Sequence, residues 1–346
     1  MLQTSSSIVS SASRLLRTPG ATIDILGAGI AGTWQALMLA KQGRRVAIYE
    51  RDTAAMANST SHVAGGMLAP RCEAESAEPV ITRLGVRSLA LWREECPETS
   101  FNGSLVVAHP RDRADFERFA RLTDRHRRLG GDAIEALEPA LAGRFREALF
   151  FPDEGHVEPR RVLPHLHARL ASMGVTIHFE RERSETTHTI VVDCRGLAAR
   201  ETLSGLRGVK GEMIVVETDE IVLSRPVRLL HPRWPLYIIP RAHNRFMIGA
   251  TTIESEDRGV SIRSALELLS AAYAVHPAFG EARIVEFSAG LRPAFPDNLP
   301  RIDIKDKTIA VNGLYRHGFL LAPALAELTA AYVARGEIDN EVMRCS

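Results

Sequence analysis

Residues 23–32 read Ile-Asp-Ile-Leu-Gly-Ala-Gly-Ile-Ala-Gly, an apolar run that leads directly into a Gly-x-Gly-x-x-Gly turn. The following residues predict a helix from Thr33 to Gln42 and a second strand that ends at Glu50. A glycine motif alone is weak evidence, but here the flanking strands, the helix and the acidic residue occur in the expected order. The stretch therefore predicts a βαβ unit that binds a dinucleotide.

Each glycine of the turn has its own expected role. Gly27 permits the tight turn, Gly29 leaves no Cβ between the backbone and a pyrophosphate, and Gly32 lets helix and strand pack closely. The phosphates would lie on unpaired amides at the helix N-terminus, where the helix dipole favours negative charge. Glu50 would accept the ribose hydroxyls, and its charge disfavours the 2′-phosphate of NADP.

The size and charge of the chain limit the classes of partner. Its 346 residues exceed one ordinary domain, so two domains are expected. The net charge of +1 gives no overall field that would attract nucleic acid or an anionic membrane. No apolar run approaches the roughly 20 residues that span a bilayer. We therefore expect neither nucleic-acid nor membrane partners.

Histidine and cysteine spacings argue against a metal site or a disulfide framework. His165 and His167 lie two residues apart on a predicted helix and so point to different faces. The cysteines form no Cys-x-x-Cys pair; they are Cys72, Cys96, Cys194 and Cys345. We expect no metal and a reducing compartment.

Two polar segments have plain structural interpretations. Residues 111–130 mix charges of both signs with Phe116, Phe119 and Leu122 at helical spacing, which predicts a solvated helix with an apolar stripe and not a nucleic-acid patch. Residues 1–21 are rich in serine and lack acidic residues, which suits either a disordered lead-in or a transit peptide. We expect the disordered lead-in.

The order of predicted elements indicates an α/β fold: a Rossmann-like nucleotide-binding domain with an inserted domain. Helices at 80–96 and 159–173 and strands at 103–107, 175–179 and 189–194 follow the first unit. Between Val209 and Leu291 strands and turns predominate, which predicts an antiparallel or mixed sheet covered by helices on one side. A strand at 308–312 and a helix at 322–334 resume the α/β alternation. The boundaries are 22–78, 154–204 and 289–346 for the nucleotide-binding domain, and 79–153 and 205–288 for the substrate domain.

Four local motifs, taken in order, resemble the D-amino-acid oxidase superfamily of FAD-dependent oxidoreductases, and most closely the glycine oxidases of thiazole (thiamine) biosynthesis. The resemblance covers about residues 22–336. The motifs are 27–32 with Glu50, 61–68 (Ser-His-Val-Ala-Gly-Gly-Met-Leu), 209–212 (Val-Lys-Gly-Glu) with 237–241 (Tyr-Ile-Ile-Pro-Arg), and 290–293 (Gly-Leu-Arg-Pro) with 315–323 (Tyr-Arg-His-Gly-Phe-Leu-Leu-Ala-Pro).

The resemblance implies FAD as cofactor, lying extended across the domain. It also implies backbone amides near Phe319 and Leu320 that face the flavin ring. We expect non-covalent binding, because Cys345 is the only cysteine after Cys194. The expected cofactor contacts are Gly27, Gly29, Ile30, Ala31, Gly32, Glu50, Arg51, Ser61, Ala64, Gly65, Met67, Gly196, Gly290, Gly318, Phe319 and Leu320.

Three residues are implied for the chemistry. Arg292 would bind the carboxylate of the substrate through two parallel hydrogen bonds, a geometry that lysine cannot reproduce. Tyr237 would add a hydrogen bond to the same carboxylate, although a tyrosine on a strand is as readily explained by core packing. Arg316 matches a second family arginine near the entrance of the site.

The implied activity is oxidative deamination of glycine or another small amine, such as sarcosine or D-alanine. Hydride passes from the α-carbon to flavin N5, the resulting imine hydrolyses, and O2 is reduced to H2O2. The imine could supply a thiazole synthase. We expect a cytoplasmic enzyme and leave a homo-oligomer open.

Three alternatives share part of this pattern. An FAD-dependent D-amino-acid dehydrogenase that passes electrons to a quinone would carry the same motifs. An NAD-dependent dehydrogenase would be colourless, whereas a flavoprotein is yellow. A nucleotide-binding module without activity would have no need of Arg292.

Overall fold

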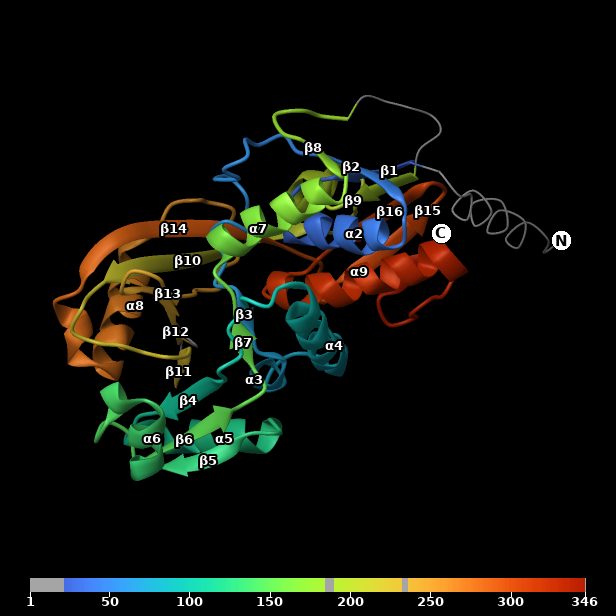
Figure 1. The fold of residues 1–346 in the computed structure, drawn as a ribbon. Coiled ribbons are helices and arrows are strands. Elements are labelled where there is room, and N and C mark those ends of the chain that lie inside the picture. The colour runs from blue at the N-terminus through green and yellow to red at the C-terminus, as the bar shows by residue number, and fades with distance from the viewer. Residues whose placement is uncertain (1–21, 184–189, 232–235, 346) are drawn as a thin grey trace.

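The chain forms two large β-sheets, each with its own helices (Figure 1). The computed structural model describes residues 22–183, 190–231 and 236–345. The expected lead-in at residues 1–21 lies outside the described residues. Within them, no helix is long and apolar enough to cross a membrane.

The first sheet, here called the nucleotide sheet, has seven strands in the order β17-β15-β16-β9-β1-β2-β8. Helices α2, α7 and α9 pack against it or against one another. The elements are β1 (Thr22–Leu26), α2 (Ile30–Lys41), β2 (Arg45–Tyr49), α7 (Pro159–Ser172), β8 (Thr176–His178), β9 (Ile190–Asp193), β15 (Arg301–Lys305), β16 (Thr308–Asn312), α9 (Gly318–Arg335) and β17 (Met343–Cys345).

Strand β1 pairs in parallel with β2 on one side and with β9 on the other. The predicted return of the chain to this sheet near residues 189–194 is therefore right. Since carboxyl ends of parallel strands meet at one edge, the glycine turn after β1 lies beside Glu50 and Cys194, which follow β2 and β9.

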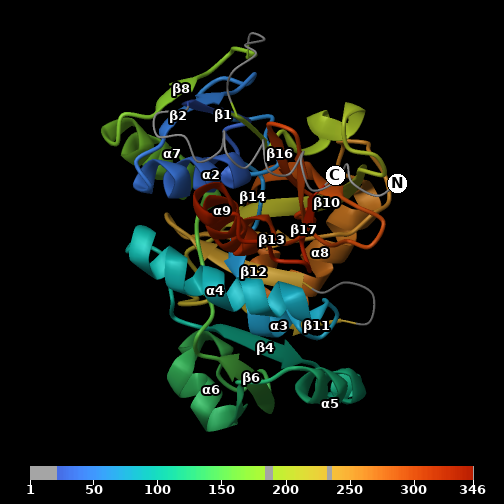
Figure 2. The same ribbon diagram turned by 90° about the vertical axis from the view of Figure 1, so that its right-hand side faces the viewer.

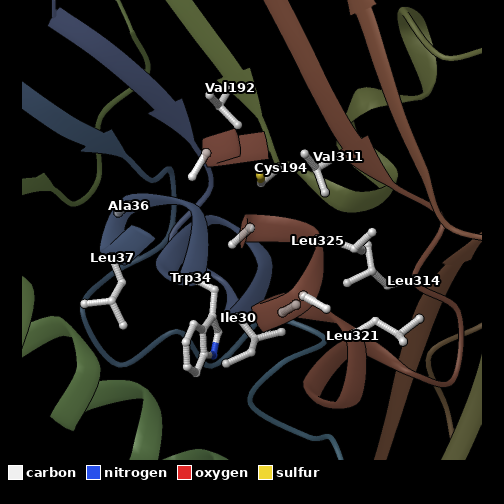
Figure 3. Close-up of a cluster of buried hydrophobic side chains, with 14 of the residues drawn as sticks. Ile30, Trp34, Ala36, Leu37, Val192, Cys194, Val311, Leu314, Leu321 and Leu325 are labelled. Atoms are coloured by element: carbon white, nitrogen blue, oxygen red, sulfur yellow. The ribbon is translucent and has the colours of Figure 1, made fainter. Parts of the chain in front are cut away.

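A hydrophobic core lies between the nucleotide sheet and its helices (Figure 3). Trp34 of α2 is fully buried and makes an edge contact with Trp92, with 4.9 Å between ring centroids. Val192 and Val311 contribute from the sheet and Leu325 from α9. Helix α2 is buried over most of its surface because α9 and α7 cover the sides that the sheet leaves free.

Helix α9 begins at Gly318, four residues before the predicted start at Ala322, so Pro323 lies inside the helix. A proline has no N–H to donate to the carbonyl four residues earlier, here that of Phe319. The indole Nε1 of Trp92 donates to this carbonyl instead, at 2.9 Å. The helix therefore tolerates the proline because a distant side chain satisfies the freed group.

Trp92 belongs to α4 (Pro79–Glu95), which lies beside α9 in both views (Figures 1 and 2). Ser88 of the same helix accepts a hydrogen bond from the amide of Ala324, at 3.1 Å. The predicted boundaries place α4 with the substrate domain, but its buried residues belong to the core of the nucleotide sheet. Amphipathicity indicated the helix but not which sheet its apolar side would face.

The second sheet, here called the substrate sheet, has eight strands in the order β14-β10-β13-β12-β11-β4-β6-β5. All its pairs are antiparallel except β11 with β4. Its elements are β4 (Ser104–Ala108), α5 (Arg113–Leu122), β5 (Arg127–Gly130), α6 (Gly131–Leu137), β6 (Glu147–Phe151), β10 (Arg207–Glu217), β11 (Val227–Leu230), β12 (Leu236–Arg241), β13 (Arg245–Gly249), α8 (Ile262–Val275) and β14 (Arg283–Ala294).

Side chains along the substrate sheet alternate between two buried faces. Ile238 and its even-numbered neighbours pack on α8. Tyr237 and Ile239 lie in a separate cluster on the opposite face with Met213 and Met247. The predicted mixed sheet is confirmed, and α8 covers one face of β10, β12 and β13. The prediction of helices on one side holds only for this part, because α5 packs on the opposite face at β4 and β6.

Residues 111–130 differ from the single helix that was predicted. Helix α5 ends at Leu122, which is 48% exposed, so only Phe116 and Phe119 form the buried stripe. Residues 127–130 form the edge strand β5, whose partner β6 also escaped prediction. An exposed, charged edge strand has no hydrophobic alternation to reveal it.

Candidate cofactor and substrate site

A cavity of about 650 Å³ extends from the glycine turn of the nucleotide sheet to the inner face of the substrate sheet. Such a volume is typical of cofactor sites. The sequence-predicted residues meet here, except Gly32 and Leu320. Those that line it are Gly27, Gly29, Ile30, Ala31, Glu50, Arg51, Ser61, Ala64, Gly65, Met67, Gly196, Gly290, Gly318, Phe319, Tyr237, Arg292 and Arg316.

The glycine turn is shaped by its neighbours. Gly27 has a φ of 95°, and a Cβ there would lie 2.8 Å from the carbonyl oxygen of Cys194. A Cβ on Gly32 would collide with the carbonyl oxygen of Gly27. Gly32 is therefore needed for close packing of α2 on the turn. A side chain at this position would point into the protein and not into the cavity.

Glu50 supports the turn from the end of β2. One carboxylate oxygen accepts the amide of Ala28 at 2.8 Å and the other accepts the amide of Asp52 at 2.9 Å. Each oxygen keeps a lone pair, so Glu50 can also accept ribose hydroxyls. Ser61 accepts the amide of Ile30 at 3.0 Å, which ties the small-residue loop to the start of α2.

Two helices begin at the cavity without a side-chain cap from their own N-cap residues. Helix α2 follows Gly29 and α9 follows His317, and neither N-cap side chain bonds an amide of its first turn. Amide groups at helix N-termini favour anions and electron-rich oxygens. One helix start suits a pyrophosphate and the other the polar edge of a flavin ring, so these residues fit an extended FAD.

Arg241 holds the small-residue loop in place from the end of β12. Its guanidinium donates to the carbonyl of Gly65 and, at 3.0 Å, to that of Val157. Gly66 has a φ of 70°, and a Cβ there would collide with the Val157 carbonyl oxygen. The close approach of these segments brings Met67 to the wall of the cavity.

Arg292 lies on β14 with its guanidinium directly over Gly211 of β10, where a Cβ would collide with it. One nitrogen donates to the carbonyl of Thr251 at 2.9 Å. Burial, followed by the charge of Arg316, lowers the pKa of Arg292 to about 10, so it stays positive at neutral pH. No carboxylate of the described residues lies within 4 Å of it, which leaves its remaining donors for an anionic ligand.

Gly211→Ala is expected to displace the Arg292 guanidinium and to lower kcat/KM for an amino-acid substrate by about tenfold or more, since overpacking costs about 1–3 kcal/mol. Flavin content should stay that of the wild type, because Gly211 lies at the substrate end. The check is steady-state kinetics together with the visible spectrum. An unchanged KM would show that the position of the Arg292 guanidinium does not depend on the missing side chain at Gly211.

Tyr237 is buried on β12 and lines the cavity. Its hydroxyl lies 3.3 Å from Arg228 and 3.5 Å from a carboxylate oxygen of Glu73. Burial raises the pKa of its phenol well above the usual range, so it remains a neutral donor. A bond from Tyr237 to a substrate carboxylate stays a prediction.

Glu73, at the end of α3 (Pro70–Glu73), is a cavity residue that the sequence did not reveal. Burial opposes its ionisation, but the charges around it, that of Arg316 first, lower its pKa to about 2. Its carboxylate lies 3.8 Å from Arg316 and 3.8 Å from His317. Burial lowers the pKa of His317 to about 4, so this ring is neutral at neutral pH.

The turn before α9 places Arg316 at the cavity. Tyr315 has a φ of 48°, a left-handed conformation that is rare for a large side chain. Its amide donates to the carbonyl of Pro293 at 2.9 Å, which holds the turn against β14. Strained residues of this kind occur often at ligand sites, and here the strain brings Arg316 and Arg292 to the same end of the cavity.

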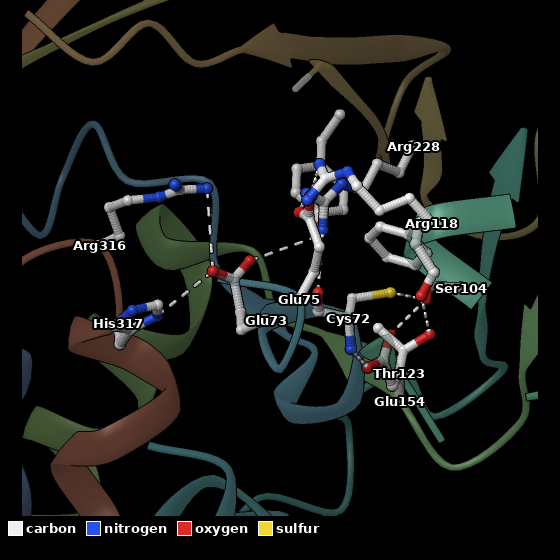
Figure 4. A network of polar contacts seen from close by, with 12 residues as sticks. Cys72, Glu73, Glu75, Ser104, Arg118, Thr123, Glu154, Arg228, Arg316 and His317 are labelled. Carbon is white, nitrogen blue, oxygen red and sulfur yellow. Dashed lines mark hydrogen bonds and ion pairs between the residues drawn. The ribbon is translucent and has the colours of Figure 1, made fainter. Parts of the chain in front are cut away.

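A buried network fixes the short helix that carries Glu73 (Figure 4). Glu154, fully buried, accepts the amides of Arg71 and Cys72 at 2.9 and 2.8 Å and bonds the hydroxyl of Ser104. It is joined to α3 through β3 (Met67–Leu68) and its partner β7 (Gly155–His156). The substrate sheet therefore determines the position of Glu73.

Glu154→Gln is expected to flatten the pH dependence of stability. Burial raises the pKa of Glu154 to about 7 from 4.5, so the folded state binds its proton more tightly than the unfolded state. Its contribution is complete below about pH 4.5 and is lost as the pH rises through about 7. The variant should lose less stability than the wild type between about pH 5 and 8, by on the order of 2–3 kcal/mol. Urea unfolding at both pH values measures this, with the exposed Glu135→Gln as control; equal slopes would refute it.

Among the described residues, no group of three or more His, Cys, Asp or Glu side chains is arranged to hold a metal ion. His167 instead bonds the carbonyl of Ala28 at 2.9 Å and lies 3.1 Å from Thr33. His165 lies 3.4 Å from Glu98.

Known proteins share this sequence and architecture. The chain is 54% identical over 304 residues to a protein assigned as the ThiO oxidoreductase of thiamine biosynthesis in Rhizobium etli, covering 87% of this chain and 92% of that protein. It is 29% identical over 355 residues to the glycine oxidase of Geobacillus kaustophilus, covering 91% and 93%. The crystal structure of that oxidase superimposes with a TM-score of 0.79 at 27% identity, covering 92% and 96%.

A third relative is longer. The bifunctional protein ThiO/ThiG of Trichormus variabilis is 27% identical over 357 residues, which are 92% of this chain but 53% of that protein.

The family model described as FAD dependent oxidoreductase matches residues 23–332, from the first residue of the glycine motif stretch to near the end of α9. This match confirms the resemblance inferred from the four motifs, and with it FAD as cofactor. The chain belongs to the D-amino-acid oxidase (DAO) family of FAD-dependent oxidoreductases.

Proposed function

We propose that the protein oxidises the amine of glycine or another small amino acid, and that the half-buried guanidinium of Arg292, free of any carboxylate among the described residues, is the feature that selects an amino acid. The likeness to the glycine oxidase of Geobacillus kaustophilus along nearly the whole chain supports this substrate class.

The residues that would hold FAD lie along the length of the cavity. Gly29 and the first amides of α2 would bind the pyrophosphate and Glu50 the ribose. Gly318 and Phe319 at the start of α9 would face the flavin ring. When bound, FAD accepts a hydride from the substrate carbon and returns the electrons to an acceptor such as O2.

The protein supplies position and charge. Arg292 would bind the substrate carboxylate through its free donors, and Tyr237 would donate a hydrogen bond to the same group. The apolar side chains of Met67 and Ile239 line the same cavity and limit the water around the reacting carbon. His317, neutral at neutral pH, adds no charge.

Further expectations follow from the same proposal. Non-covalent binding is supported because Cys345 lies on β17 at the far edge of the sheet and does not line the cavity. We propose that a thiazole synthase consumes the imine, since a relative of this chain forms about half of a bifunctional ThiO/ThiG protein. A cytoplasmic location remains part of this proposal, and the oligomeric state is left open.

The test begins with the visible spectrum of the purified protein, where flavin absorbance is expected. Anaerobic addition of glycine, sarcosine, D-alanine or D-proline should then bleach this absorbance for at least one of them, and air should restore it with release of H2O2. Bleaching without rapid reoxidation by oxygen would favour the quinone-dependent dehydrogenase. No bleaching by any of the four would refute the proposal.

A further inference from the structure

The substrate end of the cavity carries two arginines and one glutamate, all on different elements. Arg292 comes from β14, Arg316 from the turn before α9, and Glu73 from α3. Among the described residues, Arg292 has no carboxylate within 4 Å, whereas Arg316 lies 3.8 Å from Glu73. Arg292 therefore keeps its charge and free donors for an anion, whereas the charge of Arg316 is already offset by Glu73.

Glu73 is held where it is by the protein. Its side chain is 11% exposed. The helix that carries it is capped by Glu154 and anchored by Arg228, which donates to the carbonyl of Cys72 at 3.1 Å. Figure 4 shows Glu73 pointing from α3 toward Arg316 and His317. The buried network therefore fixes the backbone that carries this carboxylate, and the Tyr237 hydroxyl lies 3.5 Å from one of its oxygens.

The three groups leave one net positive charge at this end of the cavity, because the ionised Glu73 offsets one of the two arginines. An amino acid with one carboxylate and a neutral amine matches that charge. A second carboxylate on the substrate would meet Arg316 only in competition with Glu73, whose charge repels it.

We propose that Glu73 determines the substrate specificity of the site: it occupies Arg316 and thereby restricts the enzyme to amines with a single carboxylate. This inference rests on the proposed amine oxidation and adds a specificity-determining residue to it. Arg292 binds the one carboxylate that is accepted, and Arg316 is a second anion site that Glu73 keeps closed.

The test compares two amines that differ by one carboxylate, using the purified holoenzyme. Sarcosine is N-methylglycine, and iminodiacetate carries a carboxylate on the same methyl carbon. In Glu73→Gln the ratio of kcat/KM for iminodiacetate to that for sarcosine is expected to rise by about tenfold or more, since removing a repulsive charge opens Arg316. An unchanged ratio would overturn the proposal.

Two further variants separate this role from a general loss of charge. Glu75→Gln removes a carboxylate from the segment after α3 that bonds Arg118 and Arg228 and does not line the cavity, so the ratio should keep its wild-type value. In Glu73→Gln combined with Arg316→Gln the gain should disappear. A gain that persists without Arg316 would refute its part in the proposal.

A binding measurement makes the result independent of turnover. Glutarate and butyrate differ by the same carboxylate and are not amines, and calorimetry gives the Kd of each. Glu73→Gln should favour glutarate relative to butyrate by about tenfold or more. If glycine, sarcosine, D-alanine and D-proline all fail as substrates of the wild type, the proposed function fails, while this binding ratio still decides the role of Glu73. If Glu73→Gln does not fold, Glu73→Asp replaces it, because aspartate is shorter by one methylene and moves the charge away from Arg316. The kinetic ratio and the binding ratio should then both shift in the same direction as expected for Glu73→Gln, to a smaller extent. No shift in either ratio would overturn the proposal.

Discussion

Replacing Arg292 by lysine is expected to lower kcat/KM for the amino-acid substrate by about 100- to 1,000-fold, mainly through KM. A guanidinium can hold a carboxylate through two parallel hydrogen bonds, whereas an ammonium offers a point charge on a different stem. Disturbing one partner of a buried, hydrogen-bonded charge pair costs about 2–5 kcal/mol. Lysine would also lose the bond to the carbonyl of Thr251 that orients the arginine.

The matched control lies on the same strand. Arg283 begins β14, has a 75% exposed side chain and pairs with Glu217, so Arg283→Lys should leave KM at the wild-type value. Both variants should keep the flavin spectrum, which shows that the fold is intact. Normal substrate affinity in Arg292→Lys would mean that the carboxylate binds elsewhere.

Gly32→Ala is expected to yield protein with less than about a tenth of the wild-type flavin content. The new methyl group would collide with the backbone oxygen of Gly27, and a backbone atom can give way only if α2 moves relative to β1. That movement would misplace the amides of the first turn of α2. A loss of more than about 1.4 kcal/mol in binding lowers affinity at least tenfold.

The ratio of flavin absorbance to protein absorbance after dialysis measures this effect. Gly130→Ala is the control, because no atom of the described residues lies within 4 Å of the added Cβ and Gly130 lies far from the cavity at the N-cap of α6. Full flavin content in Gly32→Ala would show that the turn relaxes without loss of its binding geometry.

Local pattern was sufficient for much of this fold. The glycine turn, the returning strand at β9 and the strands of the substrate sheet other than β5 and β6 follow from apolar periodicity and turn residues within short windows. Two errors have a common physical cause. The start of α9 depends on Trp92, and the side that α4 buries depends on α9. In each case the partner lies more than 200 residues away along the chain, outside any local sequence window.

The site was predictable where a backbone requirement leaves a mark in the sequence. Glycines at positive φ or at close approaches produce such marks, and so does the Gly-Leu-Arg-Pro run at Arg292. Glu73 has none: it stands in a segment with Glu75 and Glu78, and only the path of α3 brings one of the three into the cavity. Whether an acidic side chain reaches the cavity depends on the tertiary structure and leaves no mark in the local sequence.

The indole of Trp92 that satisfies the Phe319 carbonyl has a consequence for the proposed flavin chemistry. Hydrogen bonds with α4 fix the first turn of α9 in the folded protein, so its amide dipoles are oriented without a ligand. Dipoles that are already aligned need little reorganisation when charge develops near them. The proline in α9 and the tryptophan of α4 together give this helix start a permanent electrostatic preorganisation, established by folding of the polypeptide itself.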